Sequence, residues 1–152
     1  MKLTTFSDYT LRVLMYLAMD RDRLATIPEI ASAYGISENH LMKVVHQLAR
    51  SGVVESVRGK GGGIRLALAP AEIRIGRIVR ASEGSGPVVE CHPEAGSGAT
   101  AHASCRIAPV CRLASVLATA FDAFYASLDA YTLADLIVEP RALGILLHPR
   151  PA

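Results

Sequence analysis

Three cysteines are the residues of this chain whose type and spacing best suit inorganic chemistry. Thirteen residues separate Cys91 from Cys105, and five separate Cys105 from Cys111. Paired zinc-binding cysteines usually lie about two to four residues apart, so this spacing fits a zinc finger or ribbon poorly. Thiolates at irregular spacings hold iron–sulfur clusters, and three cysteines without a signal peptide argue against a disulfide framework. The cysteines therefore favour an iron–sulfur cluster over buried inert thiols.

A four-iron cluster held by three thiolates needs a fourth ligand, which the spacing leaves open. His92 and His102 lie in the same glycine-rich segment as Cys91 and Cys105. A carboxylate, or a residue from a partner chain, is a further candidate. The N-terminal dipole of a helix that begins near Cys111 would stabilise a thiolate at that position.

A second set of residues suits contact with nucleic acid. Between residues 38 and 50 the apolar residues form one stripe and leave an outward face of polar and cationic side chains, which can pair with base edges and phosphates. The segment RGKGGG adds cations beside glycines that let the backbone approach a duplex closely. The candidate DNA contacts are Asn39, His40, Lys43, Gln47, Arg58, Lys60 and Arg65.

The elements that would position this set follow the order of a winged helix-turn-helix domain. Apolar residues at helical spacing predict helices over residues 3–19, 28–34, 38–50 and 70–82. Thr5 and Asp8 have capping-box spacing, which predicts that the first helix begins near Thr5. Gly35 ends the second helix, and Ser37 caps the third. Two β-prone runs within residues 53–68 flank RGKGGG and predict a two-stranded hairpin, the wing.

The second half of the chain has a different character. Residues 83–110 are rich in Gly, Pro, Ser, Ala and His, which predicts a long functional loop. From Cys111 to Tyr131 the apolar seam is wider than a chain of this size covers by itself, which favours a dimerisation helix over packing within one domain. The predicted class is mainly α, a winged helix-turn-helix plus a long C-terminal dimerisation helix. We expect a DNA-binding domain at 1–82, a cluster-binding loop at 83–110, and the dimerisation helix and tail at 111–152.

Composition and charge agree with a DNA-binding chain. The 152 residues are 51% hydrophobic and 20% charged, which provides enough apolar surface for a core. Residues 1–80 carry 12 Lys and Arg against 7 Asp and Glu, whereas residues 81–152 carry 4 against 7, so the first half is expected to face a polyanion. No apolar run approaches the roughly 18 residues of a membrane span, and no signal peptide is recognisable. These features predict a cytoplasmic protein without membrane contact.

Several stretches of the sequence carry a resemblance to a known family. They are KLTTFSDYTLRVLMYLA, YGISENHLMKVVHQLARSG, VRGKGGGIRLA, IRIGRIVRASE, CRIAPVCRL and LDAYTLADLI. Together they resemble the NsrR-type repressors, which sense nitric oxide and belong, with IscR, to the Rrf2 family of winged-helix iron–sulfur regulators. The resemblance extends to about Ile137. Lys60 stands where IscR-like members tend to have proline, which favours the NsrR branch.

The resemblance implies a non-enzymatic homodimer that represses promoters at palindromic operators in double-stranded DNA. It implies that Cys91, Cys105 and Cys111 hold the cluster. It also implies that Asp8 of the partner subunit completes a 4Fe–4S cluster. Arg12 lies one helical turn after Asp8, and this spacing predicts an ion pair with that carboxylate. Nitric oxide would then attack the cluster, release the tie between subunits and lift repression of nitric-oxide detoxification genes.

One departure from the family keeps alternatives open. The family's first two cysteines are usually about five residues apart, whereas HPEAGSGATAHAS lies between them here. The additional residues are small, and closing the longer loop should cost well under about 2 kcal/mol. His92 or His102 could compete as ligands, and a 2Fe–2S cluster is an alternative to the favoured 4Fe–4S form. The rival functions are an IscR-type redox or iron–sulfur-status sensor, a thiol redox protein using Cys105 and Cys111, and a zinc-stabilised interaction module.

Overall fold

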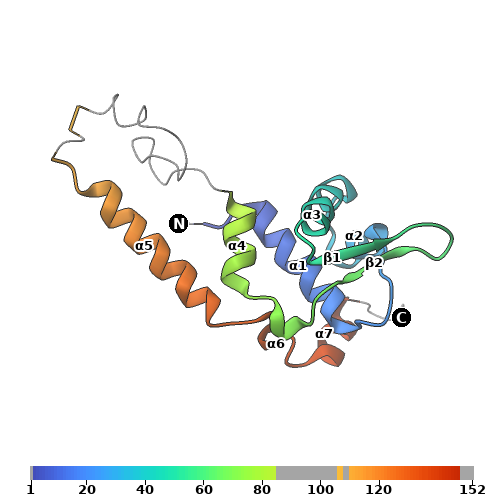
Figure 1. Cartoon of the computed structure of the whole chain (residues 1–152). Helices are drawn as coiled ribbons and strands as arrows, with labels where there is room; N and C mark the ends of the chain where they lie inside the picture. Colours follow the sequence, from blue (N-terminus) through green and yellow to red (C-terminus); the bar gives the residue numbers. More distant parts are fainter. Residues whose placement is uncertain (1, 85–105, 108–109, 148–152) are drawn as a thin grey trace.

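Helices dominate the part of the chain that this computed structural model describes, residues 2–84, 106–107 and 110–147 (Figure 1). In chain order the elements are α1 (Thr5–Met19), α2 (Ile27–Tyr34), α3 (Glu38–Arg50), β1 (Val54–Val57), β2 (Gly63–Leu66), the 3-10 turn η1 (Pro70–Glu72), α4 (Ile75–Glu83), α5 (Leu113–Asp129), α6 (Leu133–Leu136) and α7 (Pro140–Leu147). This order confirms the expected winged helix-turn-helix followed by a long helix. Among the described residues no helix is long and apolar enough to span a bilayer.

The hydrophobic core joins the helices of the winged domain to α6. Its fully buried side chains include Leu14 of α1, Ile30 of α2, Leu41 of α3, Val79 of α4 and Leu133 of α6. The apolar stripe predicted for α3 is buried as expected, since its four members are core residues: Leu41, Val44, Val45 and Leu48. Burial of this stripe fixes which face of α3 remains outside.

The turn between α2 and α3 and the hairpin have the predicted local chemistry. Gly35 ends α2 in the left-handed region at φ 65°, where glycine is favoured. Ser37 occupies the position before α3, although its side chain makes no capping hydrogen bond. The strands β1 and β2 pair antiparallel with Val57 opposite Gly63, and Gly61 adopts φ 79° in the loop between them.

The predicted capping box at the start of α1 is wrong. Thr4, not Thr5, is the capping residue, and its hydroxyl accepts a hydrogen bond from the backbone N–H of Ser7 at 3.2 Å. Thr4 is itself held by Glu83, whose carboxylate accepts its backbone N–H at 2.8 Å. A contact between residues so far apart in sequence moves the cap by one position and leaves Asp8 available for another partner.

The helix predicted over residues 70–82 is also wrong, because it is broken in two. Pro70–Glu72 forms a 3-10 turn, and α4 begins only at Ile75. The intervening Ile73 is extended, and its carbonyl accepts a hydrogen bond from Leu133 N at 2.9 Å, while Ile75 N donates to Tyr131 O at 3.0 Å. Pairing with the chain before α6 therefore replaces the helical hydrogen bonds at this point.

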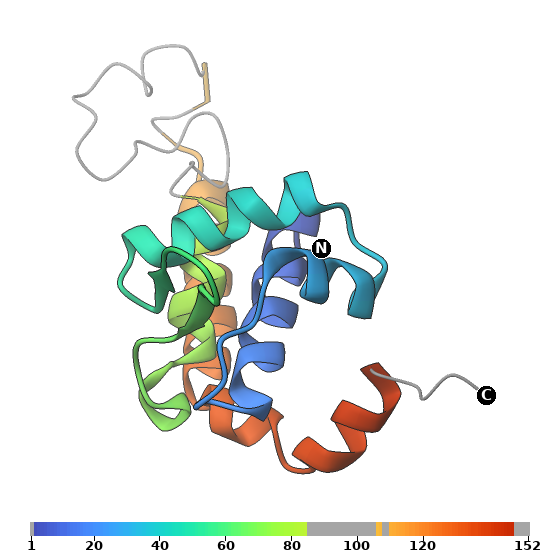
Figure 2. The same ribbon diagram turned by 90° about the vertical axis from the view of Figure 1, so that its right-hand side faces the viewer.

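Helix α5 is slightly shorter than predicted, and its apolar seam is shared between two environments. At its C-terminal end Phe124, Tyr125 and Leu128 pack against the core, and α5 runs beside α4 in both views (Figures 1 and 2). At its N-terminal end Leu113 and Val116 are 56% and 59% exposed. Packing within the domain thus explains only the C-terminal half of the seam.

Candidate DNA-binding surface and cysteine region

The outer face of α3 presents the polar residues that the sequence predicts for a recognition helix. Asn39, His40 and Lys43 are all exposed in the first half of the helix. The His40 ring lies 6.1 Å from the ring of Tyr9 on α1, so it is supported from one side. Because the N-terminal half of a recognition helix enters the major groove, these side chains are placed to meet base edges.

Met42 is a candidate contact that the sequence reasoning missed. This side chain lies outside the buried stripe of α3 and is 49% exposed. An apolar side chain on a helix that faces a major groove can contact the C5-methyl group of thymine. The helical period that defined the stripe could have identified Met42 as an outward residue.

Gln47, also predicted as a DNA contact, is engaged elsewhere in the structure. Its side-chain amide donates a 2.8 Å hydrogen bond to the carbonyl of Ala81 in α4. The second half of α3 is thereby fastened to the last turn of α4. The two partners are far apart in sequence, so no local pattern indicated this contact.

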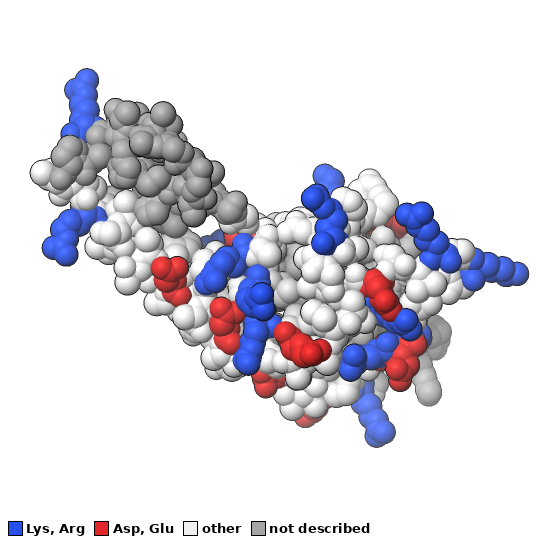
Figure 3. All heavy atoms as spheres, in the orientation of Figure 1, with Lys and Arg blue, Asp and Glu red and all other residues white. Residues whose placement is uncertain are grey.

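The wing presents two unpaired cations and one paired cation. Arg58 and Lys60 lie exposed in the loop between β1 and β2 and form no ion pair with the described residues. Arg65, in contrast, forms an ion pair with Glu55, the residue opposite it in the hairpin register. Figure 3 shows Lys and Arg side chains over α3 and toward the tip of the hairpin. Arg58 and Lys60 are therefore the wing cations available to a phosphate.

Asp8 and Arg12 form the ion pair expected on α1. The Arg12 Nε lies 3.0 Å from both carboxylate oxygens of Asp8, one helical turn away, and the two side chains are 44% and 48% exposed. The Arg12 guanidinium also lies 5.7 Å from the centre of the Tyr34 ring. Burial raises the pKa of Tyr34, and the nearby Arg12 charge partly opposes that shift. Asp8 is thus an oriented carboxylate that remains accessible from outside.

The cysteine region is described only in part. Cys91, Cys105, His92 and His102 lie outside the described residues. Cys111 is partly exposed just before α5, and its sulfur accepts a hydrogen bond from the Leu113 backbone N–H at 3.4 Å. Among residues 2–84, 106–107 and 110–147 no three His, Cys, Asp or Glu side chains are grouped to hold a metal ion.

The end of α4, which leads into the cysteine region, is anchored to the start of α1. Glu83 Oε1 accepts hydrogen bonds from the Thr4 hydroxyl at 3.0 Å and the Ser7 hydroxyl at 2.5 Å, in addition to the Thr4 backbone. Ser82 donates to Ser7 at 2.8 Å. Burial alone would raise the pKa of Glu83, but the hydrogen bonds from Ser7 and Thr4 outweigh it and lower that pKa.

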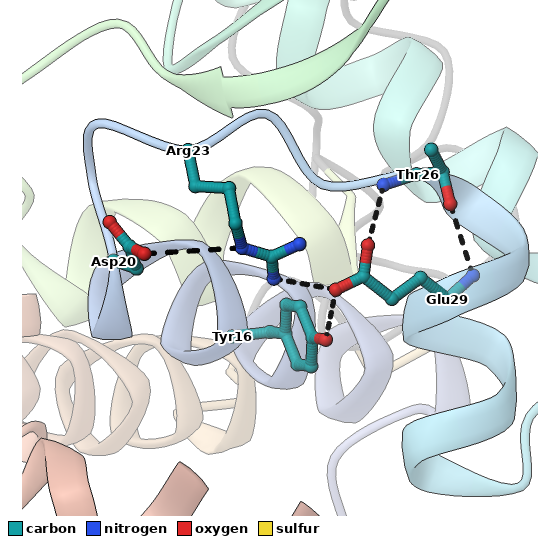
Figure 4. A network of polar contacts seen from close by, with 5 residues as sticks. All are labelled: Tyr16, Asp20, Arg23, Thr26 and Glu29. Carbon is teal, nitrogen blue, oxygen red and sulfur yellow. Dashed lines mark hydrogen bonds and ion pairs between the residues drawn. The ribbon is translucent and has the colours of Figure 1, made fainter. Parts of the chain in front are cut away.

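A polar network joins α1 to α2, the first helix of the helix-turn-helix unit (Figure 4). Glu29 accepts hydrogen bonds from the Tyr16 hydroxyl at 2.6 Å and from Arg23 at 2.5 Å, and it completes the capping box of Thr26. The hydrogen bond from Arg23 is the main reason that the pKa of Glu29 falls to about 2. Burial, aided by Glu29, raises the pKa of Tyr16 to about 12.

Comparison with known proteins identifies the family of this winged helix. A family model named Rrf2 and described as an iron-dependent transcriptional regulator matches residues 3–139. The chain belongs to the Rrf2 family. Membership makes it a DNA-binding transcriptional regulator.

Three relatives with curated descriptions are NsrR proteins. The HTH-type transcriptional regulator NsrR of Geobacillus kaustophilus is 46% identical over 151 residues, which is 99% of both chains. NsrR of Bacillus subtilis is 49% identical over 138 residues, 90% of both chains. This similarity continues through the second half of the chain.

Solved structures of other Rrf2-like regulators share the fold. IscR of T. potens matches with a TM-score of 0.68 and 28% identity, covering 90% of this chain and 86% of that one. CymR, the global cysteine regulator of B. subtilis, matches with a TM-score of 0.64 and 28% identity, covering 90% and 95%. CymR is described as a cysteine regulator, whereas the curated relatives are NsrR proteins, so the fold alone does not assign a signal.

Proposed function

We propose that this protein is a homodimeric repressor whose operator binding is controlled by an iron–sulfur cluster that reacts with nitric oxide, so that nitric oxide lifts repression of detoxification genes. The observation that carries the proposal is 46% identity to an NsrR protein over 99% of both chains. That match includes the cysteine region as well as the DNA-binding domain.

The residues that would hold the cluster are Cys91, Cys105 and Cys111, together with Asp8 of the partner subunit. The described members have suitable donor chemistry. The sulfur of Cys111 accepts an N–H at the start of α5, where the helix dipole favours a thiolate. A 4Fe–4S cluster, when bound, would supply iron atoms with which nitric oxide reacts.

A ligand role for Asp8 is compatible with its ion pair. In Figure 1 the N-terminal end of α5 points away from α1, which is compatible with a carboxylate on α1 serving a second copy. Arg12 orients the carboxylate and neutralises its charge at 3.0 Å. If Asp8 is released from an external ligand, it keeps this partner, and no unpaired charge is left on α1.

The last turn of α4 offers a route from the cysteine region to the DNA-binding surface. It is bonded to α3 through Gln47 and to α1 through Glu83. The last turn of α4 leads directly into the cysteine region. A displacement of this turn would therefore act on both α3 and α1 through these hydrogen bonds. A palindromic operator requires a fixed spacing of two recognition helices, which makes binding sensitive to such a shift.

The test uses protein isolated without oxygen and a duplex carrying its own promoter. We expect iron and acid-labile sulfide, a broad brown absorption band, and operator binding that nitric oxide abolishes. The Cys105→Ala variant should contain no cluster and bind the operator weakly. Material that lacks iron yet binds its promoter equally with and without nitric oxide would overturn the proposal. A red-brown protein with structured absorption bands would instead indicate a 2Fe–2S cluster.

A further inference from the structure

A hollow of about 480 Å³ opens on the surface beside the second half of α3. We call it the α3 hollow, and its lining residues are Phe6, Lys43, His46, Gln47, Arg50 and Ser51. Phe6 belongs to α1, so the hollow lies where α3 passes the N-terminal part of α1. Of these residues, Lys43 and Gln47 are among the predicted DNA contacts, whereas His46 and Arg50 have no assigned role.

The charge of the α3 hollow is one-sided. Lys43, His46 and Arg50 recur at helical spacing on one face, all three are exposed, and no acidic residue lines the hollow. Lys43 and Arg50 form no ion pair in the described part of the chain. A second hollow, of about 410 Å³ beside the wing, has two arginines matched by Asp22 and Glu55. The absence of such compensation marks the α3 hollow as a site for an anion.

The Gln47 side chain, which lines the α3 hollow, is held in place by a hydrogen bond and is not free to turn toward a ligand. The Gln47 amide is bonded to Ala81 O at 2.8 Å, so this side chain holds α3 against α4. The donors left for a ligand are the ammonium, imidazole and guanidinium groups at the ends of longer or rotatable side chains. Such groups on an open surface suit phosphate oxygens better than the fixed pattern of a base edge.

We propose that the α3 hollow binds a backbone phosphate of the duplex, with Arg50 and His46 as contacts beside Lys43. This inference rests on the proposed operator binding. The N-terminal half of a recognition helix meets the bases, so its C-terminal half passes the sugar–phosphate wall of the groove. The hollow then complements the wing cations Arg58 and Lys60 as a second phosphate anchor. Together the two anchors fix the orientation of α3 in the groove.

The first test measures how salt weakens DNA binding. The probes are a duplex selected by the parent protein from a random library and a scrambled duplex of the same composition. Arg50→Gln should weaken binding to both duplexes by a similar factor. It should also flatten the log–log salt dependence by about 0.9 per lost contact, or about 1.8 for a dimer on two half-sites. Lys60→Ala should do the same, whereas Arg141→Gln on the distant helix α7 should not.

The second test locates the phosphate. Single methylphosphonate groups, which lack the phosphate charge, replace the phosphates of the selected duplex one at a time. The parent should lose affinity at one position per half-site where Arg50→Gln and His46→Ala lose less, and Lys60→Ala should become less sensitive at a different position. This pattern is a double-mutant cycle between the side chain and the phosphate. Equal melting temperatures of the variants show that α3 is intact.

The outcomes separate the two proposals. If Arg50→Gln and His46→Ala bind like Arg141→Gln, the α3 hollow is not a phosphate site, while operator binding stands. If they weaken binding only to the selected duplex, they read bases, and the phosphate assignment is overturned. If the parent protein enriches no sequence from the random library, operator binding itself falls, and this inference falls with it.

Discussion

Glu29 accepts hydrogen bonds from three groups, so its protonation should weaken all of them. Its partners are the hydroxyl of Tyr16, the guanidinium of Arg23 and the backbone N–H of Thr26. Folding lowers the pKa of Glu29 from 4.5 to about 2. Because the folded-state pKa is the lower one, this stabilisation is complete above pH 4.5 and is lost as the pH falls toward 2.

We therefore expect Glu29→Gln to lower the free energy of unfolding by about 2 kcal/mol at neutral pH, allowing for solvent screening of the half-exposed Arg23. The difference in free energy of unfolding between the variant and the parent should be smaller at about pH 3, because the parent itself loses part of the Glu29 stabilisation there. Urea unfolding followed by circular dichroism measures it. Asp22→Asn is the control, since Asp22 is exposed and forms no ion pair with the described residues. A difference that is independent of pH would contradict the assigned role.

Asp8 offers a residue-scale test of the proposed ligand set. Asp8→Asn keeps the size of the side chain but replaces a carboxylate by an amide, which is a poor ligand for iron. We expect this variant to retain its fold, to lose iron faster than the parent during gel filtration without oxygen, and to bind the operator more weakly. Asp22→Asn again serves as the control. Unchanged iron retention would exclude Asp8 and move the fourth ligand to His92, His102 or another group.

Some residues of the candidate DNA-binding surface could be predicted from the sequence, and others could not. Asn39, His40 and Lys43 could be placed on the outer face of α3 from the sequence, because a 3.6-residue period defines both faces of a helix. The engagement of Gln47 by Ala81 depends on how α4 crosses α3, which no local pattern specifies. The Arg65–Glu55 pair is predictable from the sequence only in part. Its partner follows from the hairpin register, but only once the strand pairing is known.

At the scale of elements, boundaries are predictable where local chemistry decides them. Helix α3 begins and ends as predicted, because local residues set both limits: Ser37 directly precedes it, and Gly52 follows its end in the left-handed region at φ 71°. The break before α4 is different, since Ile73 bonds to Leu133 across the fold. The cap of α1 shifted for the same reason, because Glu83 holds Thr4. Long-range hydrogen bonds therefore account for the wrong start of α4 and for the wrong capping residue of α1, whereas α1 itself begins at Thr5 as predicted.

The close approach of α4 and α5 depends on Gly76. A Cβ atom at this position would lie 2.5 Å from the carbonyl oxygen of Tyr125 and 2.5 Å from Asp129 Oδ1. The first of these atoms is backbone, which cannot rotate away. The two helices must separate to admit even one methyl group.

We expect Gly76→Ala to destabilise the protein by about 2 kcal/mol, within the range observed for overpacked cores. For a chain of this length that corresponds to a melting temperature lower by about 4–8 °C. Gly144→Ala is a matched control, because Gly144 lies in α7 with no atom within 4 Å of the added Cβ. That variant should melt at the same temperature or slightly higher. Equal melting of both variants would show that α5 does not depend on this approach.

At the scale of the whole molecule, the exposed N-terminal half of α5 is the surface that the proposed dimer would bury. Leu113 and Val116 lie one turn apart there, in a helix with no buried residue among those described. A repressor of palindromic operators needs two recognition helices about one turn of DNA apart. Pairing of α5 helices would hold two winged domains together and bring Cys111 next to the second chain.

The double variant Leu113→Glu/Val116→Glu should therefore be a monomer, because it would bury two charges in that interface. Sedimentation velocity distinguishes a 16.2 kDa chain from its dimer. Ile145→Glu/Leu146→Glu is the control, since these α7 residues are 71% and 77% exposed but lie outside α5. The control should remain dimeric and bind the operator, whereas the α5 variant should bind single half-sites weakly. If instead only the α7 variant dissociates, the interface lies at the C-terminal helix, and the placement of Asp8 beside a partner's cysteines loses its basis.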